Sequence, residues 1–360
     1  MGRDFLVDAL GERLRITTHG IPESDVDALR SQWSRLPAEG DAERTLTVAC
    51  TPRAGAHVGA GLAADITGRD LDEVSVALRR AVNQRAIEAT SGRLVALHAA
   101  GLADPETGDV IALIGPSGAG KSTAAATLGT ALGYVSDETV AVAPSGAVIA
   151  FPQPLAFKLP AGRGKRVQGP DALGLRRPGE RLRLSRVALL ERSDTVTEPE
   201  VVPVGLGEVV SRVIEQVNYF SSLPRPLTAL DRIVRRCGGI HVIRYRDAAD
   251  LFAPVAELLR TGADSGAAYT RVEADDRISL DGELVVLAHD RLTRLTPISS
   301  FVWGLLDVPL TLTPLVAAVE REFGPAPDGG GADAVRGVLH ELTGAGLVRV
   351  SRAARHRALD

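Results

Sequence analysis

The stretch VIALIGPSGAGKSTAAATLGTAL, residues 110–132, decides the fold of the chain around it. Its first five residues are apolar and predict a buried strand, and its Ala- and Leu-rich end predicts a helix. Between them lies a complete G-x-x-x-x-G-K-[ST] pattern, whose glycines allow successive backbone N–H groups to turn toward an anion. The sequence therefore predicts a nucleotide-binding loop that comprises Gly115, Pro116, Ser117, Gly118, Ala119, Gly120, Lys121, Ser122 and Thr123.

Two side chains of this loop have expected roles of their own. Lys121 can reach the β- and γ-phosphates of ATP, which makes it a candidate catalytic residue, and the Ser122 hydroxyl is placed to ligate Mg²⁺. The helix that begins near Lys121 adds its positive N-terminal end to the site. ATP and Mg²⁺ are therefore the expected cofactors. The alternative is a glycine-rich strand-to-helix turn that binds no ligand.

An acidic pair follows the loop at a short distance. Asp137 and Glu138 stand fifteen residues beyond Ser122, between two apolar runs that predict a strand with acids at its end. Adjacent side chains of an extended chain point to opposite sides, so one carboxylate can face Mg²⁺ or its water shell while the other faces elsewhere or, after a bend, the acceptor hydroxyl. Both are candidate metal contacts and catalytic residues, with Asp137 as the expected general base. The alternative is an ordinary polar turn.

Composition and charge limit the class of protein. The chain has 360 residues, enough for two domains, and a formal net charge of −4, which predicts no general attraction to nucleic acid or to an anionic membrane. Cys50 and Cys237 lie far apart and form no metal-binding spacing. The N-terminus has no apolar core typical of a signal peptide, and no window has the length of a membrane span. The expected location is the cytoplasm.

The remaining chain predicts an α/β protein with a second, smaller module. Helices are expected over 71–91, 206–220 and 227–236, and an apolar strand with one histidine, His98, over 92–103. Prolines make 151–160 extended and present Lys158, a further candidate for cofactor binding. The expected units are an N-terminal α/β lead-in (1–95), a P-loop domain (96–260), a linker (261–268), a second, smaller module (269–352) and a tail (353–360).

Residues 92–160 resemble the catalytic region of the HPr kinase-like phosphotransferases, including the serine kinases of lasso-peptide pathways. The resemblance is carried by LHAAGLA, GPSGAGKST, YVSDETV and FPQPLAFK, in that order. It implies the C-terminal HPr kinase fold, with His98 and the acidic pair around the γ-phosphate and one carboxylate as base toward a serine hydroxyl. The acidic, Arg- and Gly-rich signature that usually follows is not recognisable, which argues against a bifunctional kinase/phosphorylase. Such relatives are often homo-oligomers, and this sequence leaves the oligomeric state open.

Residues 269–352 look like the PqqD-like modules that bind the leader peptides of ribosomally made natural products. The segments RVEADDRISLDGELVVL and VRGVLHELTGAGLVRV carry much of this resemblance. It implies a small, winged-helix-like α+β module that takes up an extended peptide as an added strand. The implied groove lies between the strand 283–287 and the third helix of the module.

The two resemblances together predict an ATP-dependent kinase that phosphorylates a Ser or Thr hydroxyl of a captured precursor peptide. Tethering would raise the effective concentration of the acceptor to about the millimolar range. A kinase acting on a small molecule is one alternative. A non-catalytic, nucleotide-gated protein that delivers a peptide to another enzyme is the other.

Overall fold

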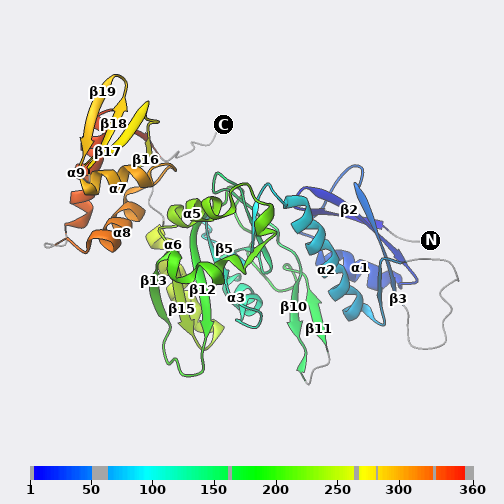
Figure 1. The fold of residues 1–360 in the computed structure, drawn as a ribbon. Coiled ribbons are helices and arrows are strands. Elements are labelled where there is room, and N and C mark those ends of the chain that lie inside the picture. Colours follow the sequence, from blue (N-terminus) through cyan, green and yellow to red (C-terminus); the bar gives the residue numbers. More distant parts are fainter. Residues whose placement is uncertain are drawn as a thin grey trace.

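The computed structural model describes residues 4–50, 64–160, 164–262, 267–280, 283–326 and 330–352. It is a mixed α/β structure with three units arranged side by side: an N-terminal unit, a central sheet with its helices, and a C-terminal module (Figure 1). Among the helices in these ranges, none combines the length and the hydropathy that a membrane span requires.

The N-terminal unit is a four-stranded sheet covered by two helices. Its elements are β1 (Asp4–Ala9), β2 (Glu12–His19), α1 (Glu23–Gln32), β3 (Arg44–Cys50), β4 (Ile66–Gly68) and α2 (Leu71–Thr90), and its strand order is β1-β2-β3-β4. The expected helix over 71–91 is confirmed as α2, which begins at the cap Asp70 and buries Val74, Leu78, Val82 and Ala86 at helical spacing. Ala141 and Phe151 of the central unit belong to the same hydrophobic core, so the two units share buried surface.

The central unit contains a nine-stranded sheet. Its strands are β5 (Val95–Ala103), β6 (Asp109–Ile114), β7 (Gly133–Ser136), β8 (Thr139–Val142), β9 (Val148–Ile149), β12 (Arg183–Arg192), β13 (Glu200–Val204), β14 (Val217–Asn218) and β15 (Ile240–Tyr245). The main order is β13-β15-β12-β6-β5-β8-β9, with β7 and β14 also paired to β5. β12 runs parallel to both β6 and β15, whereas β5 is antiparallel to its neighbours.

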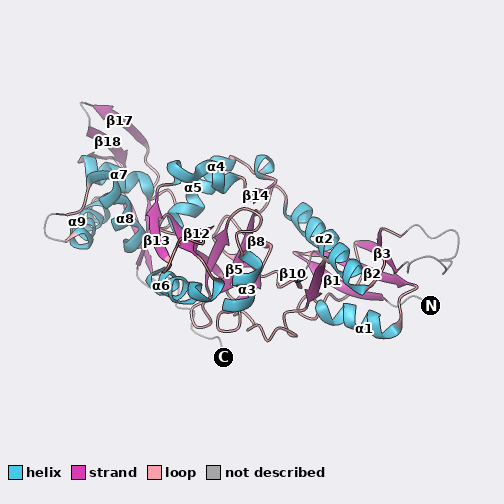
Figure 2. Cartoon of the chain, turned by 90° about the horizontal axis from the view of Figure 1, so that it is seen from below, coloured by secondary structure: helices cyan, strands magenta, loops and turns pink. Residues whose placement is uncertain are grey.

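Helices cover both faces of this sheet (Figure 2). On one face lie α3 (Lys121–Leu128) and α6 (Phe252–Gly262), and on the other α4 (Leu206–Ile214) and α5 (Pro226–Arg236). The expected strand 110–114 is confirmed as β6, in which Val110, Ala112 and Ile114 face one core and Ile111 and Leu113 the other. A strand buried on both faces reads as a continuous apolar run, which is why its sequence does not alternate.

The expected single helix over 206–220 is wrong. α4 ends at Ile214, and the chain then forms β14 on the edge of β5 and a short 3-10 helix, η2 (Phe220–Ser222). Two features end the helix: the His98 amide donates to the Gln216 carbonyl at 2.7 Å, and Tyr219 adopts a left-handed backbone conformation with φ +49°. This segment therefore lies beside His98. A hairpin of β10 (Leu155–Lys158) and β11 (Lys165–Gln168) and a 3-10 helix, η3 (Ala248–Leu251), complete the unit.

The C-terminal module has two small sheets and three helices. It consists of β16 (Ala267–Arg271), β17 (Asp276–Leu280), β18 (Glu283–Ala288), β19 (Arg291–Leu295), α7 (Pro297–Leu305), α8 (Leu312–Phe323), α9 (Gly331–Gly344) and β20 (Val348–Arg352). Trp303, 2% exposed, lies in its core and donates its indole N–H to the Leu347 carbonyl at 3.1 Å. α6 runs to Gly262 and β16 begins at Ala267, so regular structure occupies both ends of the expected linker 261–268, whose residues 263–266 lie outside the described ranges.

The module contacts the central unit at α5. Asp307 forms ion pairs with Arg232 at 3.4 Å and with Arg235 at 3.7 Å. Burial lowers the pKa of His241 in β15, and the charges of Arg186 and of Arg321 in α8 lower it further, so the charge of Arg321 acts across the same boundary. The module therefore has a defined docking face on the central unit.

Candidate functional site

The loop from Gly115 to Ser122 joins β6 to the start of α3. Gly118 and Gly120 both have φ +89°, a left-handed conformation that favours glycine, and Gly120 is the N-terminal cap of α3. The Tyr245 hydroxyl donates to the Ala119 carbonyl, and a Cβ on Gly120 would collide with that hydroxyl. Gly120, which the sequence pattern requires, is therefore required by the shape of the loop as well.

The loop leaves several backbone donors available. Ala119 donates its amide to the Pro116 carbonyl at 3.1 Å, whereas no hydrogen bond within the described chain uses the amides of Gly118, Gly120 or Lys121. Ser117 and Thr123 are exposed and Ser122 is half-buried in the first turn of α3. Unpaired amides at a helix N-terminus form a suitable cradle for phosphate oxygens.

Lys121 folds back over this loop. Its ammonium donates to the Gly115 carbonyl at 2.6 Å and to the Pro116 carbonyl at 3.3 Å, and the residue is 7% exposed. Burial lowers the pKa of Lys121, while the negative charges of Glu138 and Asp137 act in the opposite direction. The charges of both carboxylates therefore act on this ammonium.

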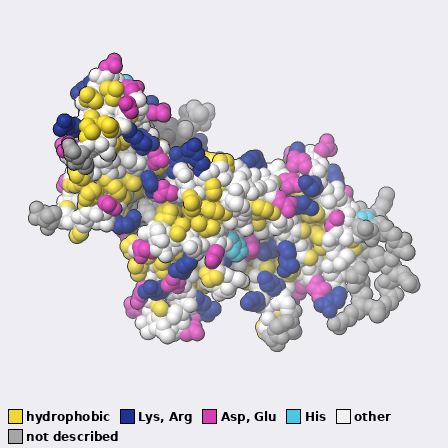
Figure 3. All heavy atoms as spheres, in the orientation of Figure 1, with side chains coloured by type: hydrophobic (Ala, Val, Ile, Leu, Met, Phe, Trp, Pro, Cys, Tyr) yellow, Lys and Arg dark blue, Asp and Glu magenta, His cyan; other side chains and the backbone are white. Residues whose placement is uncertain are grey.

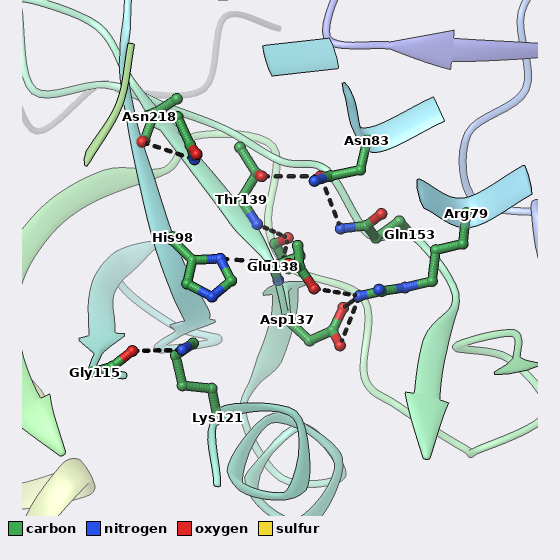
Figure 4. A network of polar contacts seen from close by, with 12 residues as sticks. Arg79, Asn83, His98, Gly115, Lys121, Asp137, Glu138, Thr139, Gln153 and Asn218 are labelled. Carbon is green, nitrogen blue, oxygen red and sulfur yellow. Dashed lines mark hydrogen bonds and ion pairs between the residues drawn. The ribbon is translucent and has the colours of Figure 1, made fainter. Parts of the chain in front are cut away.

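Asp137 and Glu138 form the two-residue connection between β7 and β8. The Ser136 hydroxyl accepts the amide of Glu138 at 3.3 Å and that of Thr139 at 3.1 Å, which fixes the turn. The side chain of Asp137 is fully buried, whereas that of Glu138 is 28% exposed. The chain bends at these two residues, so their carboxylates do not lie on opposite sides of an extended strand and both meet at one arginine, Arg79 (Figure 4).

Arg79 comes from α2 of the N-terminal unit. Its Nη2 donates to both oxygens of Asp137, at 2.9 and 3.0 Å, and to Oε2 of Glu138 at 3.0 Å, while its Nε donates to the Pro154 carbonyl at 2.6 Å. Burial alone would lower the pKa of this guanidinium, but the charges of Asp137 and Glu138 raise it overall. The Tyr134 hydroxyl adds a hydrogen bond to Asp137 at 3.2 Å. The buried carboxylate of Asp137 is therefore bonded through both oxygens.

His98 lies on β5 opposite Thr139 and faces the second oxygen of Glu138. Its Nδ1 is 3.4 Å from Oε1 of Glu138. Burial lowers the pKa of His98 and the Lys121 charge lowers it further, although Glu138 opposes both. The imidazole is therefore mainly neutral near pH 7, and Nδ1 carries the proton if it donates to Glu138.

A second set of polar groups forms hydrogen bonds that support the acidic turn. Oδ1 of Asn83 accepts the Thr139 hydroxyl at 2.9 Å and the Gln153 amide at 3.3 Å, and the Gln153 carbonyl accepts the Tyr134 hydroxyl at 2.8 Å. Asn83 follows Arg79 by four residues on α2, so one helix face supplies both side chains (Figure 4). Sequence reasoning missed Arg79, Asn83 and Gln153.

Lys158 does not join this network. It is exposed at the end of β10, opposite Lys165 on β11. Within the described chain no cluster of three or more His, Cys, Asp or Glu side chains could hold a metal ion alone. Ser122, Asp137 and Glu138 supply one hydroxyl and two carboxylates, so a Mg²⁺ ion held by them would also need oxygens from phosphate or water, which is the usual pattern for this ion.

The C-terminal module presents exposed sheet edges, but not at the expected strand. β18 pairs with β17 on one side and with β19 on the other, so the implied groove at strand 283–287 has no free backbone edge. Every residue of β17 is exposed, and Leu292 of β19 is 75% exposed. Figure 3 shows hydrophobic side chains over this part of the module, where Ile278 and Leu280 are also exposed. Among the described strands of this three-stranded sheet, those with a free edge for an added strand are therefore β17 and β19.

Comparison with known proteins identifies this module. Residues 283–348 match the family model described as coenzyme PQQ synthesis protein D (PqqD). No curated protein matches the chain. The chain therefore carries a PqqD domain at its C-terminal end, and the resemblance of residues 92–160 to HPr kinase-like phosphotransferases stays a prediction.

Proposed function

We propose that this protein is an ATP-dependent kinase that phosphorylates a Ser or Thr hydroxyl of a ribosomally made precursor peptide held by its PqqD domain. One observation carries the proposal: the glycine loop with Lys121 and the pair Glu138–His98 come from separate segments and converge on one site. A phosphate cradle beside an accessible carboxylate is the constellation that phosphoryl transfer to an alcohol requires.

The residues present fit ATP and Mg²⁺. The amides of Gly118, Gly120 and Lys121 would bind phosphate oxygens, and Lys121 would exchange its carbonyl partners for the β- and γ-phosphates. Ser122 and a carboxylate would hold the metal, which supplies charge neutralisation when bound. The acceptor oxygen forms a bond to the γ-phosphorus, the bond to the β,γ-bridging oxygen breaks, and the acceptor proton passes to a carboxylate.

Burial favours Glu138 rather than Asp137 as the carboxylate that faces the substrate. Both oxygens of Asp137 are bonded to Arg79 and its side chain has no exposed surface. Glu138 is partly exposed and directs one oxygen toward His98. We therefore assign the proton-accepting role to Glu138 and the support of the turn to Asp137, the reverse of the order expected from the sequence.

Capture of the peptide would use the PqqD domain. An extended leader segment would pair with β17 or β19. Main-chain hydrogen bonds would give affinity, and side-chain pockets would give specificity for the peptide sequence. The acceptor serine or threonine would then meet the site at an effective concentration of about millimolar. The module therefore supplies selection, and the central unit supplies the chemistry.

The test is transfer from γ-labelled ATP. The full chain is incubated with Mg²⁺, labelled ATP and leader-bearing precursor peptides encoded beside its gene, and labelled peptide is the expected product. Glu138→Gln should retain nucleotide binding and lose transfer. Label found only in small metabolites would replace the proposal with a small-molecule kinase, and nucleotide binding without any transfer would replace it with a nucleotide-gated carrier.

A further inference from the structure

Among the described residues, Arg79 is the group of the N-terminal unit that forms ion pairs with the acidic turn. It lies on α2, its side chain is 11% exposed, and its Nη2 alone contacts Asp137 and Glu138. The Nε bond to the Pro154 carbonyl fixes the plane of the guanidinium from a second direction. Neighbouring Arg80 on the same helix is exposed.

The contact determines how Glu138 is oriented. Oε2 of Glu138 is bound by Arg79 at 3.0 Å, which leaves Oε1 toward His98 at 3.4 Å. Without the guanidinium the carboxylate could rotate, and its position relative to Lys121 and His98 would no longer be fixed. Such a loss of orientation matters for catalysis because reacting groups must be held close to the productive arrangement.

The charge of Arg79 has a second consequence for an anionic ligand. Two adjacent carboxylates beside the glycine loop would repel the phosphates of a nucleotide. One buried cation between them offsets half of that negative charge. A buried ion pair is weak evidence for a purely stabilising device, because its desolvation cost offsets its attraction.

We propose that Arg79 is a positioning residue for phosphoryl transfer, so that the N-terminal unit completes the site formed by the central unit. The proposal rests on the proposed kinase function. Arg79 holds Asp137 and Glu138 as one acid pair and keeps one oxygen of Glu138 available to the acceptor hydroxyl. Lysine cannot replace it fully, because a single ammonium lacks the planar set of donors that reaches two carboxylates and a carbonyl together.

The experiment compares R79M, R79K and the matched control R80M in the full chain. The measurements are kcat and KM for ATP and the affinity for ATP with and without Mg²⁺. R79M should lose about 100-fold in kcat while KM for ATP stays within about threefold, and R80M should match the wild type. R79K should retain more activity than R79M.

Three outcomes would overturn the proposal. Equal kcat in R79M and R80M would remove any role of Arg79 while leaving the kinase function intact. A proportional fall of transfer, ATP affinity and melting temperature in both R79M and R79K, with no split between kcat and KM, would reduce the role to folding. Failure of the wild type itself to bind ATP in a Mg²⁺-dependent way would refute the kinase function and this proposal together.

Discussion

β6 and β17 are strands of opposite character in the same chain. Every residue of β6 is buried and every residue of β17 is exposed. A strand enclosed on both faces holds the glycine loop at its end in one position, whereas a strand at the edge of a small sheet leaves its backbone open to pairing. The difference predicts that the rate of the proposed phosphoryl transfer depends on the central unit and that affinity for the peptide depends on the C-terminal module. The following predictions test that division.

The largest effect is expected in the glycine loop that follows β6. Lys121→Met should reduce transfer by at least about 10³-fold, because it removes the cation that meets the phosphates. The exposed Lys165→Met on β11 is the matched control. The measurement is labelled phosphate transferred per minute, with melting temperature as a check of folding. Transfer by the Lys121 variant at the control rate would place the chemistry elsewhere.

Removal of the module should affect the peptide and not the nucleotide. For a chain ending at Gly262, kcat/KM for the precursor should fall by about 100-fold or more, since the acceptor is no longer tethered. Basal ATP turnover should stay within about threefold of the full chain. Steady-state kinetics with both substrates measure this division. An equal loss of both activities would mean that the two regions act as one.

A smaller effect should identify the edge that binds the leader. Leu292→Asp on β19 should weaken leader-peptide affinity by about tenfold, because the most exposed large apolar side chain of the module is lost. Ile278→Asp on β17 serves as the paired variant and should change affinity by less than about threefold. Fluorescence anisotropy with a labelled leader measures both. The reverse ranking would place the peptide on β17.

The smallest effect is expected where the two regions meet. Burial lowers the pKa of His241 to about 4, with further contributions from Arg186 and from Arg321 of the module. A lowered pKa disfavours the protonated form in the folded state, so the stability that neutral His241 provides is present above pH 6.5 and is lost as the pH falls toward about 4. Allowing for partial solvent exposure, the loss is about 1–2 kcal/mol.

The corresponding variant is His241→Gln. Its unfolding free energy should change less between pH 7 and pH 4 than that of the wild type, as followed by chemical denaturation at several pH values. If the unfolding free energies of the two proteins changed identically with pH, His241 would make no contribution to the loss of stability at acid pH.

Local patterns in the sequence predicted the local parts of the structure. β6, the glycine loop and α3 follow one another without interruption, so their apolar run, glycine spacing and Ala-rich helix could be interpreted together. The acidic turn was recognised for the same reason. Its geometry was not, because the alternation of an extended strand does not apply to a two-residue connection whose carboxylates are drawn to one cation.

Contacts between distant segments could not be predicted in this way. Arg79 lies 58 residues before Asp137, and in the sequence it is one of two adjacent arginines on a helix, a pattern typical of a solvent-exposed face. The pairing of β14 with β5 depends on tertiary hydrogen bonds that override helix propensity over 206–220. The resemblance to PqqD-like modules implied β18 as the binding strand, yet whether a strand is central or at an edge is decided by its neighbours.

Ala141 and Phe151 occupy the same core as α2, and this has a consequence for dissecting the chain. A fragment that begins at β5 would expose that apolar surface and would lack the guanidinium beneath Asp137. The N-terminal and central units should therefore denature in one transition. Neither unit should be replaceable by the corresponding unit of another protein. A truncated chain that keeps basal ATP turnover should therefore lack only the C-terminal module beyond α6.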